Sequence, residues 1–265
     1  MLDSPDMSRW LLALALVPVA LFAAEPFEGT WKVDLGKVDL PTKIDKMELK
    51  DGMYSCPTCV PAIHIKADGT SQKVTGANTY DAISIRVIDG QTVEETDKKA
   101  GRTVETDRTT VSADGSHATV QFTEYPENGS KPVTGEVSLL RVEKGAAGSH
   151  AISGGWRQER VGALSNNGIT LTYKMTAEGL NYATPRGESY TAKFDGKDYP
   201  YKGNAGVDMV SLRRIDANTF DITRKKDGKV VSLTHVAIAA DGKTGNVTGE
   251  NKLEGATIKY AIVKQ

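Results

Sequence analysis

Hydrophobic and polar residues alternate with a period of two along much of the chain after residue 25. The segments ISIRV (83–87) and VSLRR (210–214) each place aliphatic residues on one face and polar residues on the other. The polar residues of interest in these two segments are Ser84, Arg86, Ser211 and Arg213. Alternation over five to eight residues predicts β-strands, and no stretch after residue 25 has the pattern of a long amphipathic helix.

Tight-turn signals separate the predicted strands at regular intervals. Asp-Gly pairs stand at 51–52, 68–69, 89–90 and 114–115, and this pair is a strong hairpin signal because glycine tolerates positive φ. Short connections predict an antiparallel meander, and a long meander leaves two open edges unless it closes into a barrel. We therefore expect an all-β protein built of antiparallel up-and-down barrels.

An internal repeat indicates how many barrels to expect. Residues 51–120 align with residues 178–247 without a gap, and DAISIRVIDGQTVEETDKKAG lies above DMVSLRRIDANTFDITRKKDG. A period of this length indicates two whole domains rather than a solenoid of short units. The predicted units are residues 25–145 and 146–265, each a barrel, and a single large barrel built from both units is the alternative.

The first 24 residues have the pattern of an export signal. Arg9 and Trp10 precede an apolar run at 11–24, LLALALVPVALFAA. The run is shorter than the roughly 20 residues of a membrane-spanning helix, so a cleaved signal peptide at 1–24 is expected rather than an anchor. The sequence thus predicts a periplasmic or secreted bacterial protein with no membrane span in the mature chain.

Charge and motifs exclude several classes of function. The chain has 33 basic and 34 acidic residues, a formal net charge of −1, which offers no basic field for nucleic acid. It contains no G-x-S-x-G, no H-E-x-x-H and no glycine-rich phosphate loop. We therefore predict no catalytic residues, no metal and no cofactor, and hence no enzyme; a lumenal isomerase or hydrolase is the least favoured hypothesis.

Two tryptophan motifs carry a resemblance to a known fold. Gly29-Thr30-Trp31 and Gly154-Gly155-Trp156 resemble the G-x-W motif of the first strand in lipocalins. In that group an arginine of the last strand often packs on this tryptophan, and Arg141 stands at a suitable place in the first unit. The second unit has YAIVK at the corresponding place, without an arginine. The resemblance assigns structural roles to Trp31, Trp156 and Arg141.

A closer resemblance covers most of both units. YTAKFDGKDYPYKGN (190–204), followed by VSLRRID and TRKKDGKVV within 210–231, is similar to segments of uncharacterised secreted bacterial proteins with tandem lipocalin-like repeats. The resemblance implies a lipocalin-like fold and export, and it implies no activity.

The only two cysteines, Cys56 and Cys59, are spaced C-x-x-C, and His64 follows. The second unit has no cysteine at the aligned positions, so the barrel itself does not need the pair. A small-loop disulfide is favoured in an exported protein. A metal site using His64 and a pair of reactive thiols remain open as alternatives.

Function is expected to depend on what the barrels enclose. The leading hypothesis is an exported binding protein that holds a small hydrophobic or anionic molecule in a barrel lumen. Ser84, Arg86, Ser211 and Arg213 are the candidate ligand-binding residues, provided that their face lines the lumen; if the aliphatic face lines it, they lie in solvent. The rival hypothesis is a structural or protein-interaction module of the cell envelope with filled barrels.

Overall fold

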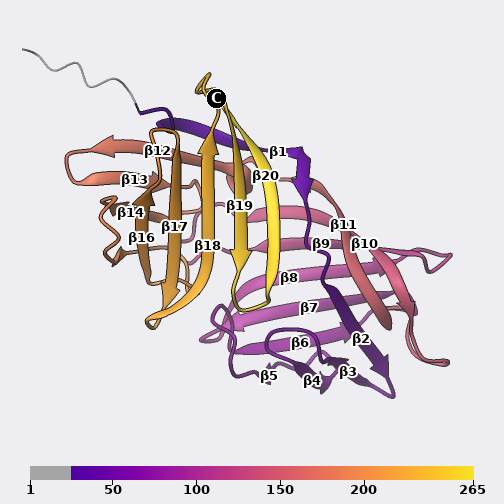
Figure 1. Cartoon of the computed structure of the whole chain (residues 1–265). Helices are drawn as coiled ribbons and strands as arrows, with labels where there is room; N and C mark the ends of the chain where they lie inside the picture. The colour runs from indigo at the N-terminus through magenta and orange to yellow at the C-terminus, as the bar shows by residue number, and fades with distance from the viewer. Residues whose placement is uncertain (1–24) are drawn as a thin grey trace, which may run out of the picture.

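The computed structural model describes residues 25–265 and contains strands β1 to β20 with one short helix, α1 (Asn166–Ile169). The predicted signal peptide at 1–24 lies outside the described residues. Within 25–265 no helix is long and apolar enough to cross a membrane. The strands form two ten-stranded antiparallel sheets, each curled into a barrel (Figure 1). The prediction of two barrels is confirmed, and the single large barrel is wrong.

We call the first sheet barrel 1, and its strands follow one another along a continuous stretch of chain, residues 44–164. Its strand order is β4-β3-β2-β11-β10-β9-β8-β7-β6-β5. The strands of barrel 1 are β2 (Ile44–Lys50), β3 (Met53–Cys56), β4 (Ile63–Lys66), β5 (Gln72–Lys73), β6 (Ala82–Val87), β7 (Thr92–Lys99), β8 (Arg102–Val111), β9 (His117–Glu124), β10 (Val133–Lys144) and β11 (Gly154–Leu164).

Barrel 2 contains the remaining strands, and one of them comes from the start of the described chain. Its strand order is β14-β13-β12-β1-β20-β19-β18-β17-β16-β15. The strands of barrel 2 are β1 (Gly29–Asp39), β12 (Thr170–Thr176), β13 (Gly179–Ala183), β14 (Ser189–Ala192), β15 (Tyr199–Pro200), β16 (Met209–Arg214), β17 (Thr219–Lys226), β18 (Lys229–Ile238), β19 (Thr244–Asn251) and β20 (Ala256–Lys264).

Each sheet nearly closes on itself through a few bonds between its end segments. In barrel 2, Ser189 and Lys202 exchange both backbone hydrogen bonds, at 3.0 and 2.9 Å. In barrel 1, the Gly69 amide donates to the Ile85 carbonyl at 2.8 Å. These contacts satisfy part of the exposed edge that an open meander would leave.

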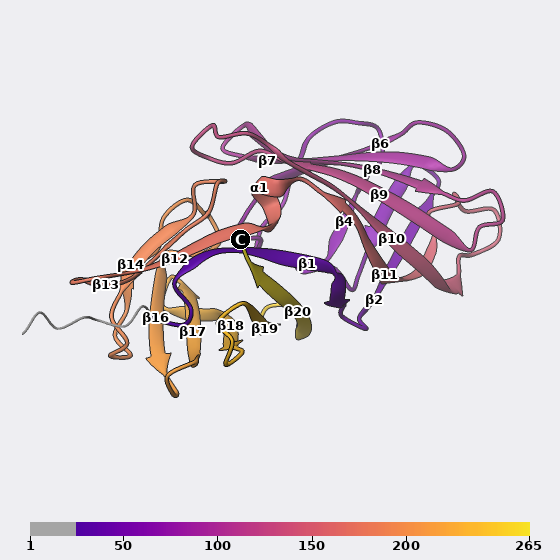
Figure 2. The same cartoon turned by 90° about the horizontal axis from the view of Figure 1, so that it is seen from above.

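The first strands of the two sequence units have changed places. β11, the first strand of the second unit, pairs with β10 and β2, whereas β1 pairs with β20 and β12. We expected each unit to close with its own first strand, and this expectation is wrong. Residues 145–153 join β10 to β11 by a short connection, which favours pairing of these two strands as a hairpin. The sheets therefore divide the chain at about residues 40 and 165, whereas the sequence repeat divides it at 145 (Figures 1 and 2).

The exchange also changes the tryptophan contacts. Trp31 and Trp156 are fully buried, and each indole Nε1 donates at 2.7 Å to a carbonyl four residues earlier. The Arg141 guanidinium lies 4.0 Å from the centre of the Trp156 ring, and Lys264 Nζ lies 5.1 Å from that of Trp31. Arg141 was expected on the tryptophan of its own unit, and it packs instead on that of the other unit, because β11 occupies the place next to β10.

Tight turns fix the hairpin registers as the sequence predicts. Ala100-Gly101 joins β7 to β8 with φ of 49° and 81°, and Asp227-Gly228 joins β17 to β18 with 48° and 75°. Positive φ at both central residues is the type I′ geometry that matches the twist of a hairpin. These turns determine which residues of β7 face which residues of β8.

A disulfide joins Cys56 and Cys59, which confirms the favoured interpretation of the C-x-x-C pair. Cys56 is fully buried and belongs to the apolar core of barrel 1. Because both sulfur atoms are in the covalent bond, neither is a thiolate available to a metal. His64 is exposed, and its Nδ1 lies 2.6 Å from Ser55 Oγ.

Candidate functional site

Four carboxylates point into barrel 1 from two neighbouring strands. On β6, Ile83 and Ile85 are buried and face the interior. They lie opposite Asp97 and Glu95 of β7, which in turn lie opposite residues 105 and 107 of β8. The lumenal carboxylates are Glu95, Asp97, Glu105 and Asp107. We call them the lumen carboxylates.

The lumen carboxylates have no cation to neutralise them. None of the four takes part in an ion pair with any residue of the described chain, 25–265. Asp97 is only 8% exposed, and its Oδ1 is buried without a hydrogen-bond partner; Asp107 Oδ1 is likewise buried and unpartnered. Unpaired buried charge is costly, so a positively charged partner would stabilise the ionised form of these four carboxylates.

Burial and mutual repulsion shift the titration of these groups strongly upward. Burial, and then the charge of Asp107, raise the pKa of Asp97 to about 7. Burial, then Asp107, Glu124 and Asp97, raise the pKa of Glu105 to about 8. Burial and Glu124 raise the pKa of Asp107 to about 6, and burial raises the pKa of Glu95 well above its ordinary value. The cluster thus titrates near neutral pH, where perturbed groups are typical of functional sites.

A cavity of about 220 Å³ lies where barrel 2 faces barrel 1, and two of the lumen carboxylates, Asp97 and Glu105, line it. Barrel 1 contributes most of its wall, including Tyr80, Asp97, Arg102, Glu105 and Glu124, and loops of barrel 2 contribute the remainder. The residues of barrel 2 at this mouth are Arg186, Glu188, Gly203, Asn204 and Ala205. We call this cavity the acidic mouth.

Arg186 is the cation that barrel 2 places at the acidic mouth. Its Nη1 donates to Glu124 Oε2 at 3.1 Å, and its Nη2 donates to Glu188 Oε1 at 2.9 Å. Glu188 also accepts a bond from Asn204 Nδ2 at 2.7 Å. The guanidinium is thus already shared by two carboxylates of the rim and does not reach the lumen carboxylates.

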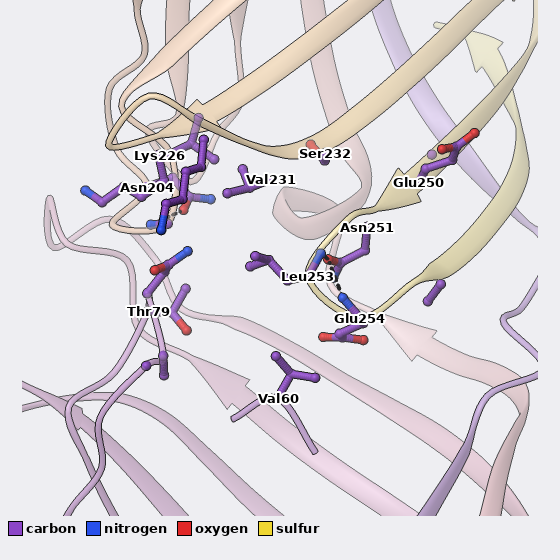
Figure 3. A pocket seen from close by; sticks show the side chains of 18 of the residues that line it. Val60, Thr79, Asn204, Lys226, Val231, Ser232, Glu250, Asn251, Leu253 and Glu254 are labelled. Atoms are coloured by element: carbon purple, nitrogen blue, oxygen red, sulfur yellow. Dashed lines mark hydrogen bonds between the residues drawn. The ribbon is translucent and has the colours of Figure 1, made fainter. Parts of the chain in front are cut away.

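A larger cleft of about 710 Å³ lies between the barrels and adjoins the acidic mouth. Thr79, Tyr80 and Asn204 line both cavities. Figure 3 shows Val60 of barrel 1 on the opposite side of this cleft from Leu253 of barrel 2. Both side chains are unusually exposed for their type, at 47% and 50%. The cleft therefore offers a partly apolar approach to the acidic mouth.

Barrel 2 has a different and more completely filled interior. The positions equivalent to the lumen carboxylates are Ile222, Arg224, Ser232 and Thr234, with the same strand register. The Arg224 Nη1 donates to Thr234 Oγ1 at 2.8 Å. The Arg224 guanidinium lies 5.9 Å from the centre of the Tyr201 ring. Aromatic rings fill much of the interior; those that are buried in barrel 2 are Phe27, Trp31, Tyr173, Tyr182, Tyr190, Tyr201 and Phe220. The acidic lumen is therefore a property of barrel 1 alone.

The candidate ligand-binding residues of the sequence analysis lie on the outside of the barrels. The side chain of Arg86 is 64% exposed and pairs with Glu94, and that of Arg213 is 73% exposed and pairs with Asp221 at 2.9 Å. Ser84 and Ser211 alternate with buried aliphatic residues and share this outer face with the arginines. Arg86 and Arg213 therefore do not form a lumenal site for an anionic ligand.

Sequence reasoning missed the lumen carboxylates although the signal was present. Taken alone, the segment VEETD (93–97) has charged residues on both faces of a strand and does not single out an inner row. The apolar residues Ile83 and Ile85 of the neighbouring strand, with a hairpin turn at 89–90, assign Asp97 and Glu95, which lie opposite them, to the inner face. The repeat reinforces this assignment, because the apolar Ile222 stands at the position of Glu95.

No family model and no curated protein matches the sequence. The geometry of the acidic mouth and lumen is therefore the basis for assigning a function.

Proposed function

We propose that this protein is an exported, non-enzymatic binding protein that holds a small, positively charged molecule in the acidic mouth and lumen of barrel 1. A single observation carries the proposal: Asp97 is almost fully buried, has an unpartnered carboxylate oxygen and lines an accessible cavity. A cation entering this cavity would offset the electrostatic cost of the unpaired, ionised carboxylates.

The contrast between the barrels favours binding over a purely structural role. Glu95, Glu105 and Asp107 face the interior of barrel 1, and Glu105 lines the acidic mouth together with Asp97. The equivalent Ile222 of barrel 2 is 1% exposed. Barrel 2 thus serves as a filled scaffold whose loops complete the acidic mouth of barrel 1.

The non-enzymatic character is supported by the position of the histidines. His64, His117, His150 and His235 form their hydrogen bonds away from the lumen carboxylates. Export is supported by the Cys56–Cys59 disulfide, which is typical of oxidising compartments, together with the apolar run at 11–24 of the sequence.

Ligand-induced stabilisation tests the proposal. Thermal unfolding would be followed at pH 8 with calcium chloride, butylamine, cadaverine, sodium acetate and sodium laurate. We expect at least one of the cations to raise the melting temperature, because a ligand that binds only the folded state stabilises it, and we expect acetate and laurate to have no effect. Native mass spectrometry of the exported protein would show whether a ligand is retained.

The variant Asp97→Asn/Glu105→Gln should abolish the stabilisation by cations. Glu94→Gln is the matched control: Glu94 lies on the same strand but faces outward, towards Arg86 and Arg108. The proposal fails if no cation stabilises the wild-type protein, or if the effect persists in the double variant.

A further inference from the structure

The arrangement of the lumen carboxylates points to the class of cation. Resting on the proposed function, we infer that the ligand is a linear diamine or polyamine, a flexible apolar chain that carries an ammonium group at each end. The inference stands on the two-tier placement of the carboxylates, on the unpartnered Asp97, and on the apolar side chains that adjoin the inner tier.

The lumen carboxylates form two tiers at different depths. Asp97 and Glu105 are directly opposite each other on β7 and β8 and form the outer tier, which lines the acidic mouth. Glu95 and Asp107, also directly opposite each other, form the inner tier. The tiers are two residues apart along each strand, a separation of about 7 Å. Two ammonium groups on a chain of four or five carbons span a comparable distance.

A single metal ion does not fit this arrangement. In the described part of the chain, no three of these carboxylates bring an oxygen each within 4.8 Å of one another. Calcium requires about six to eight oxygen ligands around one point. Charges distributed along the lumen instead suit a ligand whose own charges are separated.

The wall between the charges is suited to an aliphatic chain. Ile85 lies opposite Glu95, Val93 precedes Glu95 by two residues on the inner face, and Phe122 lies opposite Asp107 on β9. Tyr80 lines the acidic mouth and offers an aromatic face, which attracts ammonium groups. Ile85 and Val93 are buried in the core of barrel 1, so a methylene chain that reaches the inner tier would enter apolar surroundings while each of its ends meets a carboxylate pair.

Isothermal titration at pH 8 with cadaverine, butylamine and calcium chloride distinguishes the classes. We expect cadaverine to bind about tenfold more tightly than butylamine, because a second charge pair worth roughly 1.4 kcal/mol changes affinity by that factor. Equal affinities for the two amines, or tighter binding of calcium, would overturn the inference and leave the proposed function intact. If none of the three cations binds, the proposed function itself fails.

The inner tier supplies a sharper test. Glu95→Gln/Asp107→Asn should reduce the affinity for cadaverine to that for butylamine while the affinity for butylamine itself changes little. Circular dichroism and urea unfolding would show that the variant is folded, and Glu94→Gln is again the outward-facing control. A cadaverine advantage that survives removal of the inner tier would contradict the two-tier assignment.

Discussion

Arg186 Nη1 lies 3.1 Å from Glu124 Oε2, and the two residues belong to different barrels. Glu124 ends β9 of barrel 1, and Arg186 lies in the loop between β13 and β14 of barrel 2. The same guanidinium holds Glu188, whose side chain is only 7% exposed. The pair thus joins the barrels at the acidic mouth and places a positive charge of the protein beside the path of a cationic ligand.

Replacing Arg186 should lower the stability of the protein and raise its affinity for a cationic ligand. Arg186→Ala leaves the buried Glu188 without its cation, and we expect a loss of roughly 2 kcal/mol in the free energy of unfolding, since breaking a buried pair is costly. Removal of a competing positive charge should at the same time raise the affinity for cadaverine by about threefold to tenfold. Urea unfolding and titration calorimetry measure the two effects.

Arg213→Ala is the control for this variant. Arg213 pairs with Asp221 on the outer surface of barrel 2, and such exposed pairs contribute less than about 1 kcal/mol. We expect nearly unchanged stability and unchanged cadaverine affinity. A fall in affinity for Arg186→Ala would show that Arg186 helps to bind the ligand rather than competing with it.

The lumen carboxylates should make the unliganded protein less stable as pH rises. Their pKa values are about 6 for Asp107, 7 for Asp97 and 8 for Glu105, all above the values of the unfolded chain. Such groups bind protons more tightly in the folded state, so they stabilise it at low pH, and this contribution is lost as pH rises through 6 to 8. We expect the free energy of unfolding to fall by a few kcal/mol between pH 5 and pH 8.5, since one pKa unit is about 1.4 kcal/mol.

The groups around this cluster define the controls for the pH profile. The charged and titratable side chains that line the lumen or the mouth, or act on its carboxylates, are Asp45, Tyr54, Tyr80, Glu95, Asp97, Arg102, Glu105, Asp107, Glu124, Glu127, Arg186 and Glu188. Asp97→Asn/Glu105→Gln should flatten the profile, and cadaverine should restore stability at pH 8. A free energy of unfolding that rises from pH 5 to pH 8.5 would contradict this prediction, because it would show that ionising the carboxylates does not destabilise the folded protein.

The disulfide should contribute modestly to stability. It closes a loop with a sequence separation of only 3, and the entropy removed from the unfolded chain by so short a loop is worth about 2 kcal/mol. We expect Cys56→Ala/Cys59→Ala to lose about that amount in urea and to keep its fold. A variant that no longer folds would show that the Cys56–Cys59 loop organises the edge of barrel 1.

The sequence was sufficient for the architecture because the architecture depends on local rules. Alternation such as that at 83–87 fixes the strand faces, and turns such as Ala100-Gly101 fix the hairpin registers. The exchange of β1 and β11 depends on which barrel each strand fits better, and local sequence rules do not compare the two barrels. Both strands carry a buried tryptophan preceded by a glycine with positive φ, Gly29 or Gly154, so their sequences suit either barrel.

The site was harder to predict because it violates the pattern that reveals the fold. Charged residues on the inner face, Glu95 and Asp97, look like solvent-facing positions to any rule that expects apolar interiors. Arg86 and Arg213 were candidate site residues because both units have an arginine at this position. Residues that both units share reflect the fold that the two barrels have in common. The acidic lumen is found where the units differ, at Asp97 against Arg224.

Fragments of the chain test the strand exchange directly. Residues 40–165 contain all ten strands of barrel 1, including β11, whereas the first sequence unit, 25–145, has β1 in place of β11. We expect the fragment 40–165 to fold and to unfold cooperatively in urea, because β2 and β10 keep their partner and Arg141 keeps its contact with Trp156. The fragment 25–145 leaves these two edges without β11 and should be largely unfolded. If the fragment 25–145 were equally stable, β1 would be able to replace β11 beside β10, and the partner of each first strand would be set by chain connectivity alone.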